Sequence, residues 1–278
     1  MIRYRQAAAL WTQVGYPSFE SEYELKQKIE SAAEAGFDVI QWDVVPGLRE
    51  MLDEFGMDLW GYIPGQEIEG LEQRVDEIAD AGARYATVHL LKHDTEPEKA
   101  TDVLVRLVSY AKEKGLTVAI ETHRNTATET PEKFEQILTG FKAATGELMP
   151  VTWDFSHFGV VKHLMPDEYS ERLLVWPELI RNSPLFHCRP FNGHHVQVPV
   201  TGPDGELTVE VKRYLSFVKD LFRLWLDGDQ TNEEIIVCPE MGPADEMGYN
   251  LQSLPNSWDD ARVLRGELKR VWDEVSGA

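Results

Sequence analysis

The stretch "DAGARYATV", residues 80–88, contains the pattern that decides the fold. Its acidic start closes an amphipathic segment, a glycine follows, and the last residues form an apolar run. Gly82 stands where a helix ends in a left-handed residue, a conformation that a side chain would strain. The same order recurs in "EAGFDVI" (34–40), "EFGMDLW" (54–60), "EKGLTVAI" (113–120) and "ATGELMPVTW" (144–153). The chain is therefore expected to repeat a unit of helix, glycine turn and strand.

Apolar runs rich in branched and aromatic residues are the candidate strands. There are eight, near residues 4–10, 37–43, 57–62, 84–90, 116–121, 150–154, 184–189 and 234–240. Apolar residues with 3.6-residue spacing predict helices, in the ranges 68–79, 100–111, 134–141 and 261–275. The motif "SWDD" (257–260) predicts a capping box at the start of the last helix.

Strands that alternate with helices pair in parallel and connect through right-handed crossovers. Eight such units predict an α/β fold of the (β/α)8 TIM-barrel type, in a single domain over residues 1–278. An open doubly wound sheet is the runner-up, and the lack of a Gly-rich GxGxxG motif after the first strand counts against it.

Residues 190–211 are expected to form a hairpin-like insertion after the seventh strand, because apolar residues alternate on both sides of a Pro-Asp-Gly turn in "VPVTGPDGELTVEV" (198–211). This insertion would serve as a lid or a dimer contact. The Gly/Pro-rich loop 241–257, with Tyr249, is a candidate cover for the pocket.

The composition limits the classes of partner. The chain has 278 residues and a formal net charge of −21, so its surface repels nucleic acid and anionic membranes. Two cysteines, Cys188 and Cys238, make a disulfide framework improbable and suit a reducing compartment, which predicts a cytoplasmic protein. No stretch reaches about 18 consecutive apolar residues, the length expected of a membrane-spanning helix.

Ionisable residues stand at the ends of the last four candidate strands. They are Glu121, Asp154, His187 and Glu240, within "LTVAIETHRN", "PVTWDFSHF", "PLFHCRPF" and "EEIIVCPEMGP". In a barrel of this type the C-terminal strand ends meet at one mouth and carry the active site. Side-chain alternation places Glu121 on the same face as Ala119, away from the helices.

Three carboxylates that converge on one mouth would repel each other, and at least one would have a strongly raised pKa. A divalent cation removes this conflict. Oxygen ligands with one imidazole and no thiolate suit Mn, Mg, Co or Zn, and we expect manganese first. The other interpretation is that these are separate acids at loop edges, each solvated or paired with an arginine.

The dense run "LFHCRPFNGHH" (185–195) holds three histidines, but only His187 stands at a strand end. His194 and His195 fall in the following loop and are expected in the hairpin or lid. Trp11, Trp42 and Trp60 lie near strand ends, where they would form an apolar wall for a sugar, although at least one is expected to pack in the core.

The series of Glu, Asp, His and Glu, with "ETHR", "DFSHF", "HCR" and "PEMGP", resembles the xylose-isomerase-like TIM-barrel superfamily. This superfamily includes D-tagatose 3-epimerase-like enzymes, hydroxypyruvate isomerases, inosose dehydratases and endonuclease IV. The motifs look most like its sugar phosphate isomerase/epimerase group. The resemblance implies that Glu121, Asp154, His187 and Glu240 bind one divalent metal, and that Glu121 and Glu240 are the catalytic proton carriers.

The resemblance also implies a substrate contact for His157 and for Arg189, although Arg189 follows the histidine more closely than in the well-known epimerases. Arg124 would bind substrate or pair with Glu121. His89 would line the pocket or serve a structural role. His123 would support the ligands or simply pack.

A metal-dependent sugar isomerase or epimerase, acting by proton transfer through an enediolate, is the first functional expectation. A lyase or dehydratase on a keto-sugar or keto-inositol would use the same groups. A phosphodiesterase like endonuclease IV would need more histidines and a basic surface, and a silent sugar-binding barrel would not need both glutamates. The expected partner is a small carbohydrate, and we expect it to carry no phosphate group. The sequence is also compatible with a homo-oligomer.

Overall fold

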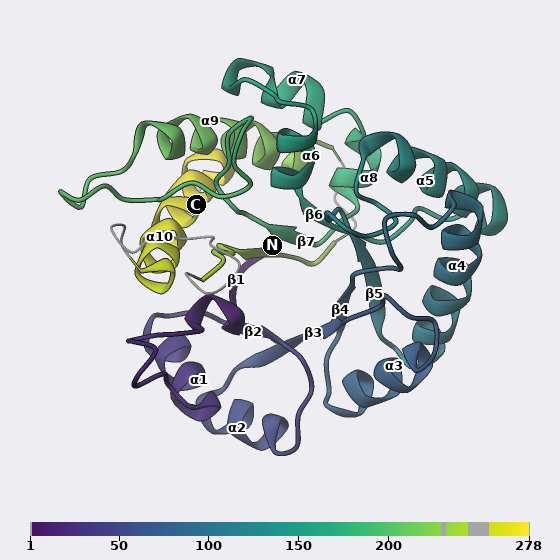
Figure 1. Cartoon of the computed structure of the whole chain (residues 1–278), viewed down its shortest axis with the longest axis horizontal. Helices are drawn as coiled ribbons and strands as arrows, with labels where there is room; N and C mark the ends of the chain where they lie inside the picture. The colour runs from purple at the N-terminus through teal and green to yellow at the C-terminus, as the bar shows by residue number, and fades with distance from the viewer. Residues whose placement is uncertain (1, 229–231, 244–255, 278) are drawn as a thin grey trace.

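The computed structural model describes residues 2–228, 232–243 and 256–277. Eight parallel strands follow each other in chain order around a closed barrel, and β8 pairs with β1 (Figure 1). Each strand overlaps an expected run, which confirms the predicted α/β TIM barrel. The strands are β1 (Arg3–Ala9), β2 (Val39–Trp42), β3 (Asp58–Ile63), β4 (Tyr85–Val88), β5 (Thr117–Glu121), β6 (Val151–Asp154), β7 (Leu185–His187) and β8 (Glu234–Cys238).

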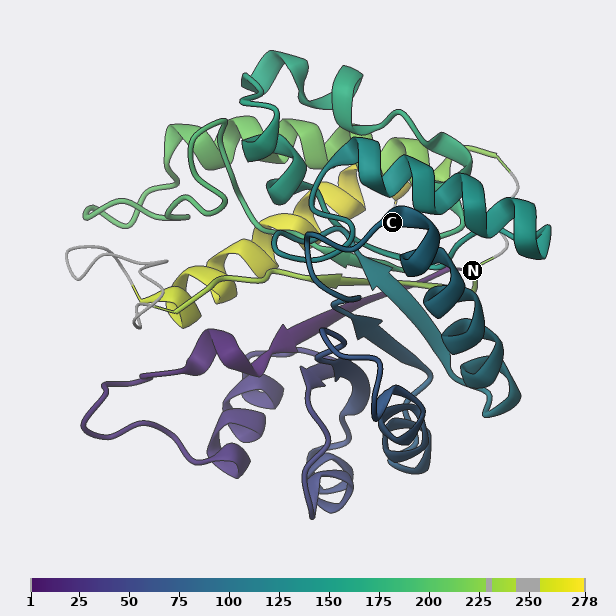
Figure 2. The same ribbon diagram turned by 45° about the vertical axis from the view of Figure 1, so that its right-hand side comes forward.

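The helices surround this barrel on its outside (Figures 1 and 2). The long ones are α1 (Leu25–Glu34), α2 (Leu48–Phe55), α3 (Leu71–Asp80), α4 (Pro97–Glu113), α5 (Pro131–Thr145), α9 (Val209–Leu226) and α10 (Ser257–Ser276). Short helices fill the connections, namely η1 (Leu10–Gln13), α6 (Phe155–Val161), η2 (Pro166–Glu168), α7 (Tyr169–Leu173) and α8 (Pro177–Arg181). None of the helices in the described residues is long and apolar enough to cross a membrane.

The ends of two helices differ in detail from the sequence expectation. Helix α10 is capped by Asn256, whose side chain accepts a hydrogen bond from the backbone N–H of Trp258. The capping box expected at Ser257 is therefore wrong by one residue, because Ser257 is already helical and donates its hydroxyl to the carbonyl of Gly242. Helix α3 begins at Leu71, so Ile68 precedes it and stays exposed instead of lining its buried face.

Side-chain alternation along the strands separates two apolar layers. The outer layer, between strands and helices, contains Val118 and Ile120 of β5. The barrel interior contains Ala119 of the same strand, together with Ala7, Ala9, Val39, Trp60, Leu185, Ile236 and Cys238. Trp60 is fully buried there, so it belongs to the core and not to a pocket wall. The interior is filled by side chains and is not a pore, as in other barrels of this type.

A network of ion pairs occupies the N-terminal end of the barrel. The carboxylate of Glu234, which is almost fully buried, is ion-paired with Arg3, Arg5 and Arg84 at 3.4, 3.6 and 2.9 Å. It also accepts a hydrogen bond from the hydroxyl of Tyr85. The opposite, C-terminal end is thus the one available for a functional site.

The chain between β7 and α9 runs over residues 188–208. Its Pro-Asp-Gly turn forms, but it closes a single antiparallel bridge between Thr201 and Leu207. The expected hairpin is reduced to this bridge because helix α9 already begins at Val209 and takes the residues of the second arm. Tyr249 of the other expected covering loop lies outside the described residues.

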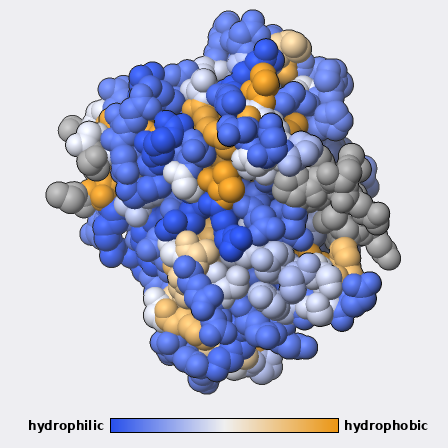
Figure 3. All heavy atoms as spheres, turned by 90° about the vertical axis from the view of Figure 1, so that its left-hand side faces the viewer, coloured by the Kyte–Doolittle hydropathy of each residue, from blue (hydrophilic) through white to orange (hydrophobic). Residues whose placement is uncertain are grey.

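One side of the molecule is mostly hydrophilic, with apolar atoms in small patches (Figure 3).

Candidate metal centre and substrate pocket

Four ionisable side chains meet inside the C-terminal mouth of the barrel. Glu121, Asp154 and His187 are the last residues of β5, β6 and β7, and Glu240 follows β8 by two residues. The strand register sets two of them side by side, because Asp154 pairs with His187 across β6 and β7. One ligand atom from each of the four lies within 4.8 Å of the others. Strand ends that are far apart in sequence thus form one compact cluster.

The imidazole of His187 lies at the centre of the cluster. Its Nδ1 is 3.1 Å from Oε1 of Glu121 and 3.5 Å from Oε2 of Glu240. The ring packs against the indole of Trp60, with the ring centroids 5.0 Å apart and the planes tilted by 32°, and this indole is itself fixed by a hydrogen bond to Thr87. One nitrogen of His187 therefore faces the carboxylates from a ring that the barrel core holds in place.

The pKa values of the cluster reflect this crowding. Burial alone would raise the pKa of Glu121, but His187 and His89 outweigh it and hold this pKa well below its usual range. Burial raises the pKa of Asp154 to about 6, opposed by Arg189 and aided by the charges of Glu240 and Glu121. Burial lowers the pKa of His187, yet Glu240 and Glu121 more than reverse this and raise it to about 9. Without a metal the cluster thus needs protons to balance its charge.

The bonding of Asp154 tests whether a metal fits. Its Oδ1 caps helix α6 by accepting a hydrogen bond from the backbone N–H of Ser156. Its Oδ2 is buried, and within the described part of the chain no donor forms a hydrogen bond to it. A buried carboxylate oxygen without a hydrogen-bond donor is costly unless a cation faces it, and the guanidinium of Arg189, 3.6 Å away, compensates it only in part. Three carboxylates with one imidazole, gathered around such an oxygen, are a donor set that suits a hard or borderline divalent ion.

A guanidinium group also enters the cluster. Arg189, which is 2% exposed, donates a hydrogen bond from Nη2 to Oε2 of Glu240, and the same nitrogen is 3.6 Å from Oδ2 of Asp154. Its guanidinium lies over the ring of Trp11, which donates a hydrogen bond to Oε1 of Glu240. Arg189 therefore carries one positive charge into the cluster, where it is paired with carboxylates.

A cavity of about 550 Å³ opens above the cluster. Its wall is partly aromatic, with Trp11, Trp42 and Tyr62. Pro64 adds a further apolar surface, and the polar lining includes the expected residues His89, Glu121, Arg124, His187, Arg189 and Glu240, and also Gln41, Asp43 and His123. A cavity of this size and character is typical of a small-molecule site.

Three histidines form a row along one side of the cluster. The ring of His89 stacks on that of His123 at 3.9 Å, and His123 contacts His157 at 4.3 Å. Burial lowers the pKa of His123 to about 3, with help from the neighbouring His89, so its ring is neutral. Its Nδ1 lies 2.6 Å from the carbonyl oxygen of Arg124, which fixes the proton on that nitrogen.

His89, Glu121 and His123 also bring ligand atoms within 4.8 Å of one another. The two imidazole planes are only 23° apart, however, and a metal binds an imidazole in the plane of its ring. An ion between two nearly parallel rings would lie off both lone pairs. We therefore assign these side chains to the pocket wall and not to a second metal centre.

Other expected site residues lie elsewhere. His157 is 2% exposed and sits behind His123, with its Nε2 3.4 Å from Oδ2 of Asp154, so it is positioned against a ligand and not on the cavity surface. Its pKa is well below its usual range because of burial and the neighbouring His123 and Arg189. His194 and His195 are exposed, and their backbone N–H groups bind the side chain of Asn192 in the loop after β7.

Gln41 and Tyr62 were missed by the sequence reasoning. The hydroxyl of Tyr62 is 2.9 Å from Nδ1 of His89, whose Nε2 is 2.9 Å from Oε2 of Glu121. The side-chain amide of Gln41 lies 2.8 Å from Nε2 of His187. Both residues stand at the C-terminal ends of strands, β2 and β3, so the strand-end rule applied to those strands would have found them.

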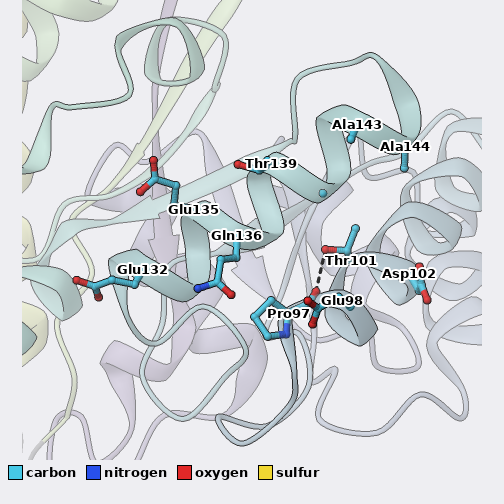
Figure 4. Close-up of a pocket in the computed structure, with 11 residues that line it drawn as sticks. Pro97, Glu98, Thr101, Asp102, Glu132, Glu135, Gln136, Thr139, Ala143 and Ala144 are labelled. Carbon is cyan, nitrogen blue, oxygen red and sulfur yellow. Dashed lines mark hydrogen bonds between the residues drawn. The ribbon is translucent and has the colours of Figure 1, made fainter.

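A second, larger groove of about 950 Å³ lies between helices α4 and α5 (Figure 4). Its carboxylates come from Glu98, Asp102, Glu132 and Glu135, which are all exposed side chains of the outer helices. Solvated acids on helix surfaces supply no converging chemistry, so we place the functional site at the barrel mouth.

The fold matches solved structures over nearly the whole chain. A D-tagatose 3-epimerase-like protein superposes with a TM-score of 0.64 at 15% identity, covering 98% of this chain and 99% of its own. An L-ribulose 3-epimerase gives 0.64 at 11% identity, with 99% and 96% covered. A D-allulose 3-epimerase from Methylomonas sp. gives 0.61 at 14% identity, with 99% and 98% covered. At identities this low, the superpositions show that this chain shares the barrel fold of these proteins. Neither a protein-family model nor a curated sequence matches the chain.

Proposed function

We propose that the chain is a divalent-metal-dependent isomerase or epimerase of a small, unphosphorylated carbohydrate. The observation that carries this proposal is the cluster of Glu121, Asp154, His187 and Glu240, whose ligand atoms lie within 4.8 Å of one another beneath an aromatic-walled cavity. The structural neighbours include an L-ribulose 3-epimerase and a D-allulose 3-epimerase, which supports the same class of reaction.

The four side chains would hold one divalent ion, with manganese the first expectation and Co, Mg or Zn as alternatives. When bound, such an ion would polarise a substrate carbonyl and stabilise negative charge on its oxygen. With three carboxylates, the guanidinium of Arg189 and a neutral His187, a dication also brings the formal charge of the set to zero. A neutral set accepts the negative charge of an enediolate better than an anionic set does.

Two glutamates would move the protons. Glu121 is anionic at neutral pH because its pKa is held well below the usual range, and it lies beside Nδ1 of His187. Glu240 is also near that nitrogen, with its Oε2 3.5 Å away, and two donors, Trp11 and Arg189, fix its carboxylate. One glutamate would take the proton from the carbon next to the carbonyl. The other would return a proton, to the opposite face for epimerisation or to the neighbouring carbon for isomerisation.

The charges around the cavity favour a substrate without phosphate. Within the described residues that line it, the cations are Arg124 and Arg189, and Arg189 is already ion-paired with two carboxylates. Lys92 and Lys162 form ion pairs with Glu67 and Glu132 and are not among the residues that line the cavity. A phosphate group would need more donors than this lining supplies.

Deuterium exchange would test the proposal. A panel of ketoses and 3-keto-glycosides is incubated in heavy water with the metal-loaded protein, and products are followed by NMR and mass spectrometry. Incorporation of deuterium next to the carbonyl, with an intact carbon skeleton and no lost group, is the expected result. Loss of water or of a glycosyl group would assign the chain to the lyases instead. No exchange with any member of the panel would contradict the proposal.

A further inference from the structure

Gln41 lies behind His187, on the side away from the carboxylates. It belongs to β2 and is 6% exposed. Its Nε2 is 2.8 Å from Nε2 of His187, and its Oε1 is 3.9 Å from the thiol of Cys238. The side chain therefore spans the barrel interior between an expected metal ligand and a buried cysteine. It is 146 residues from His187 in sequence.

The contact between two nitrogens ties the orientation of the Gln41 amide to the protonation of His187. The amide N–H can donate to Nε2 only when that nitrogen has a lone pair, which in this arrangement leaves the ring proton on Nδ1, 3.1 Å from Oε1 of Glu121. A ring nitrogen that carries a proton cannot bind a metal ion. The amide orientation with its nitrogen on His187 is therefore incompatible with a metal ion on Nδ1.

Metal binding reverses these requirements. His187 faces the other ligands through Nδ1, so this nitrogen must lose its proton and Nε2 must carry it. A buried N–H on Nε2 then needs an acceptor. The oxygen of the Gln41 amide becomes that acceptor if the amide turns by 180°, a change that the similar size of the oxygen and NH₂ groups allows. The amide N–H then faces Cys238, whose sulfur changes from donor to weak acceptor.

We propose that Gln41 is a positioning residue for the metal centre, and that its side-chain oxygen holds the proton of His187 on Nε2 so that Nδ1 is free to bind the ion. This inference rests on the proposed function, since it concerns the same metal site. Trp60 fixes the plane of the ring from one side, and Gln41 selects which of the two nitrogens is protonated. Groups in this position behind a metal-binding histidine tune its orientation and basicity.

Cobalt(II) binding to the full chain tests the role of Gln41. The dissociation constant is measured by competition with a chromophoric chelator for wild type, Gln41→Leu and Gln41→Glu. Leucine has a similar volume but accepts no hydrogen bond, so we expect it to weaken binding by about 10- to 100-fold. A carboxylate accepts the Nε2 proton more strongly, so Gln41→Glu should bind cobalt at least as tightly as wild type.

A second buried glutamine provides a matched control. Gln6 of β1 is 2% exposed and donates to the carbonyl of Arg265, far from the ligands. We expect Gln6→Leu to lower the unfolding temperature while its cobalt affinity stays within about twofold of wild type. The same comparison separates a loss of positioning from a general loosening of the barrel.

The possible results are distinguishable. Gln41→Leu with wild-type affinity, or Gln41→Glu with affinity as weak as that of the leucine variant, would overturn the positioning role and leave the metal site intact. A wild-type protein that binds no cobalt would contradict the proposed function, and the positioning role with it. If Gln41→Leu fails to fold, the affinity of Gln41→Glu relative to wild type decides alone, and a weaker value overturns the inference.

Discussion

Arg189 and Glu240 form a buried ion pair in the barrel mouth, between Nη2 of the arginine and Oε2 of the glutamate. The same arginine nitrogen is 3.6 Å from Oδ2 of Asp154, so one guanidinium serves two of the three clustered carboxylates. Both members of the pair are almost fully buried, so each charge offsets the cost of burying the other. The pair therefore affects the stability of the fold as well as the chemistry of the site. The arginine thus does part of the charge balancing that the ion is proposed to complete.

Removal of Arg189 should therefore destabilise the metal-free protein more than the loaded one. We expect Arg189→Leu to cost about 3–5 kcal/mol in the presence of a chelator, because it leaves buried carboxylates without a cation. With cobalt(II) bound, the ion offsets part of this cost. Urea unfolding with and without cobalt measures the difference. The exposed pair of Arg262 and Asp259 gives the control, since Arg262→Leu should cost no more than about 1 kcal/mol in either condition. Equal losses for Arg189→Leu in both conditions would contradict the shared role.

Asp154 can be neutralised without loss of its structural hydrogen bond. In Asp154→Asn the side-chain oxygen still caps α6 by accepting the N–H of Ser156, but the negative charge is gone. We expect cobalt affinity to fall by more than about 100-fold, beyond the range typical of groups behind the ligands. Asp260 is a control aspartate of similar burial that binds Val200 and Thr201. Asp260→Asn should change the unfolding temperature and not the affinity, and an unchanged affinity in Asp154→Asn would remove Asp154 from the ligand set.

Metal binding should release a proton near neutral pH. Burial, with the charges of Glu240 and Glu121, raises the pKa of Asp154 to about 6. Burial lowers the pKa of His187, but the same two carboxylates outweigh it and raise that pKa to about 9. Between these values Asp154 is ionised while His187 is protonated, so the ion displaces about one proton, and affinity should rise about tenfold per pH unit. Above about pH 9 the rise should level off. Calorimetry with cobalt(II) in buffers of different ionisation enthalpy counts the protons, and a constant affinity from pH 7 to 8.5 would be the contrary result.

Glu240 should be required for proton transfer more than for folding. We expect Glu240→Gln to slow deuterium exchange into a responsive substrate by about 10²–10⁴-fold, the usual contribution of a general base. Glu234, at the opposite end of the same strand region, gives the matched control because it is also buried and paired with arginines. Glu234→Gln should lower stability and leave the exchange rate per folded molecule unchanged. Wild-type exchange in Glu240→Gln would assign the proton transfer to another group.

The regular part of the fold was predictable because its signals are local. A helix ended by glycine, such as α2 at Gly56 with φ 67°, is decided by a few neighbouring residues, and so is the apolar run that follows. Details were not predictable where two local structures compete for the same residues. Asn256 took the cap that Ser257 was expected to provide, and α9 took the residues of the expected hairpin, because each choice depends on contacts with distant parts of the chain.

The sequence by itself determined the barrel and placed Glu121, Asp154, His187 and Glu240 at strand ends, because periodicity and position along a strand are properties of a short stretch of chain. Only the tertiary structure decided which side chains touch. Closure of the barrel through β1 and β8 carries Gln41 to His187 and Trp11 to Glu240, across 146 and 229 residues of sequence. It also brings the guanidinium of Arg189 to the carboxylates of Asp154 and Glu240. This contact depends on the direction of one buried side chain, which has no local signal in the sequence.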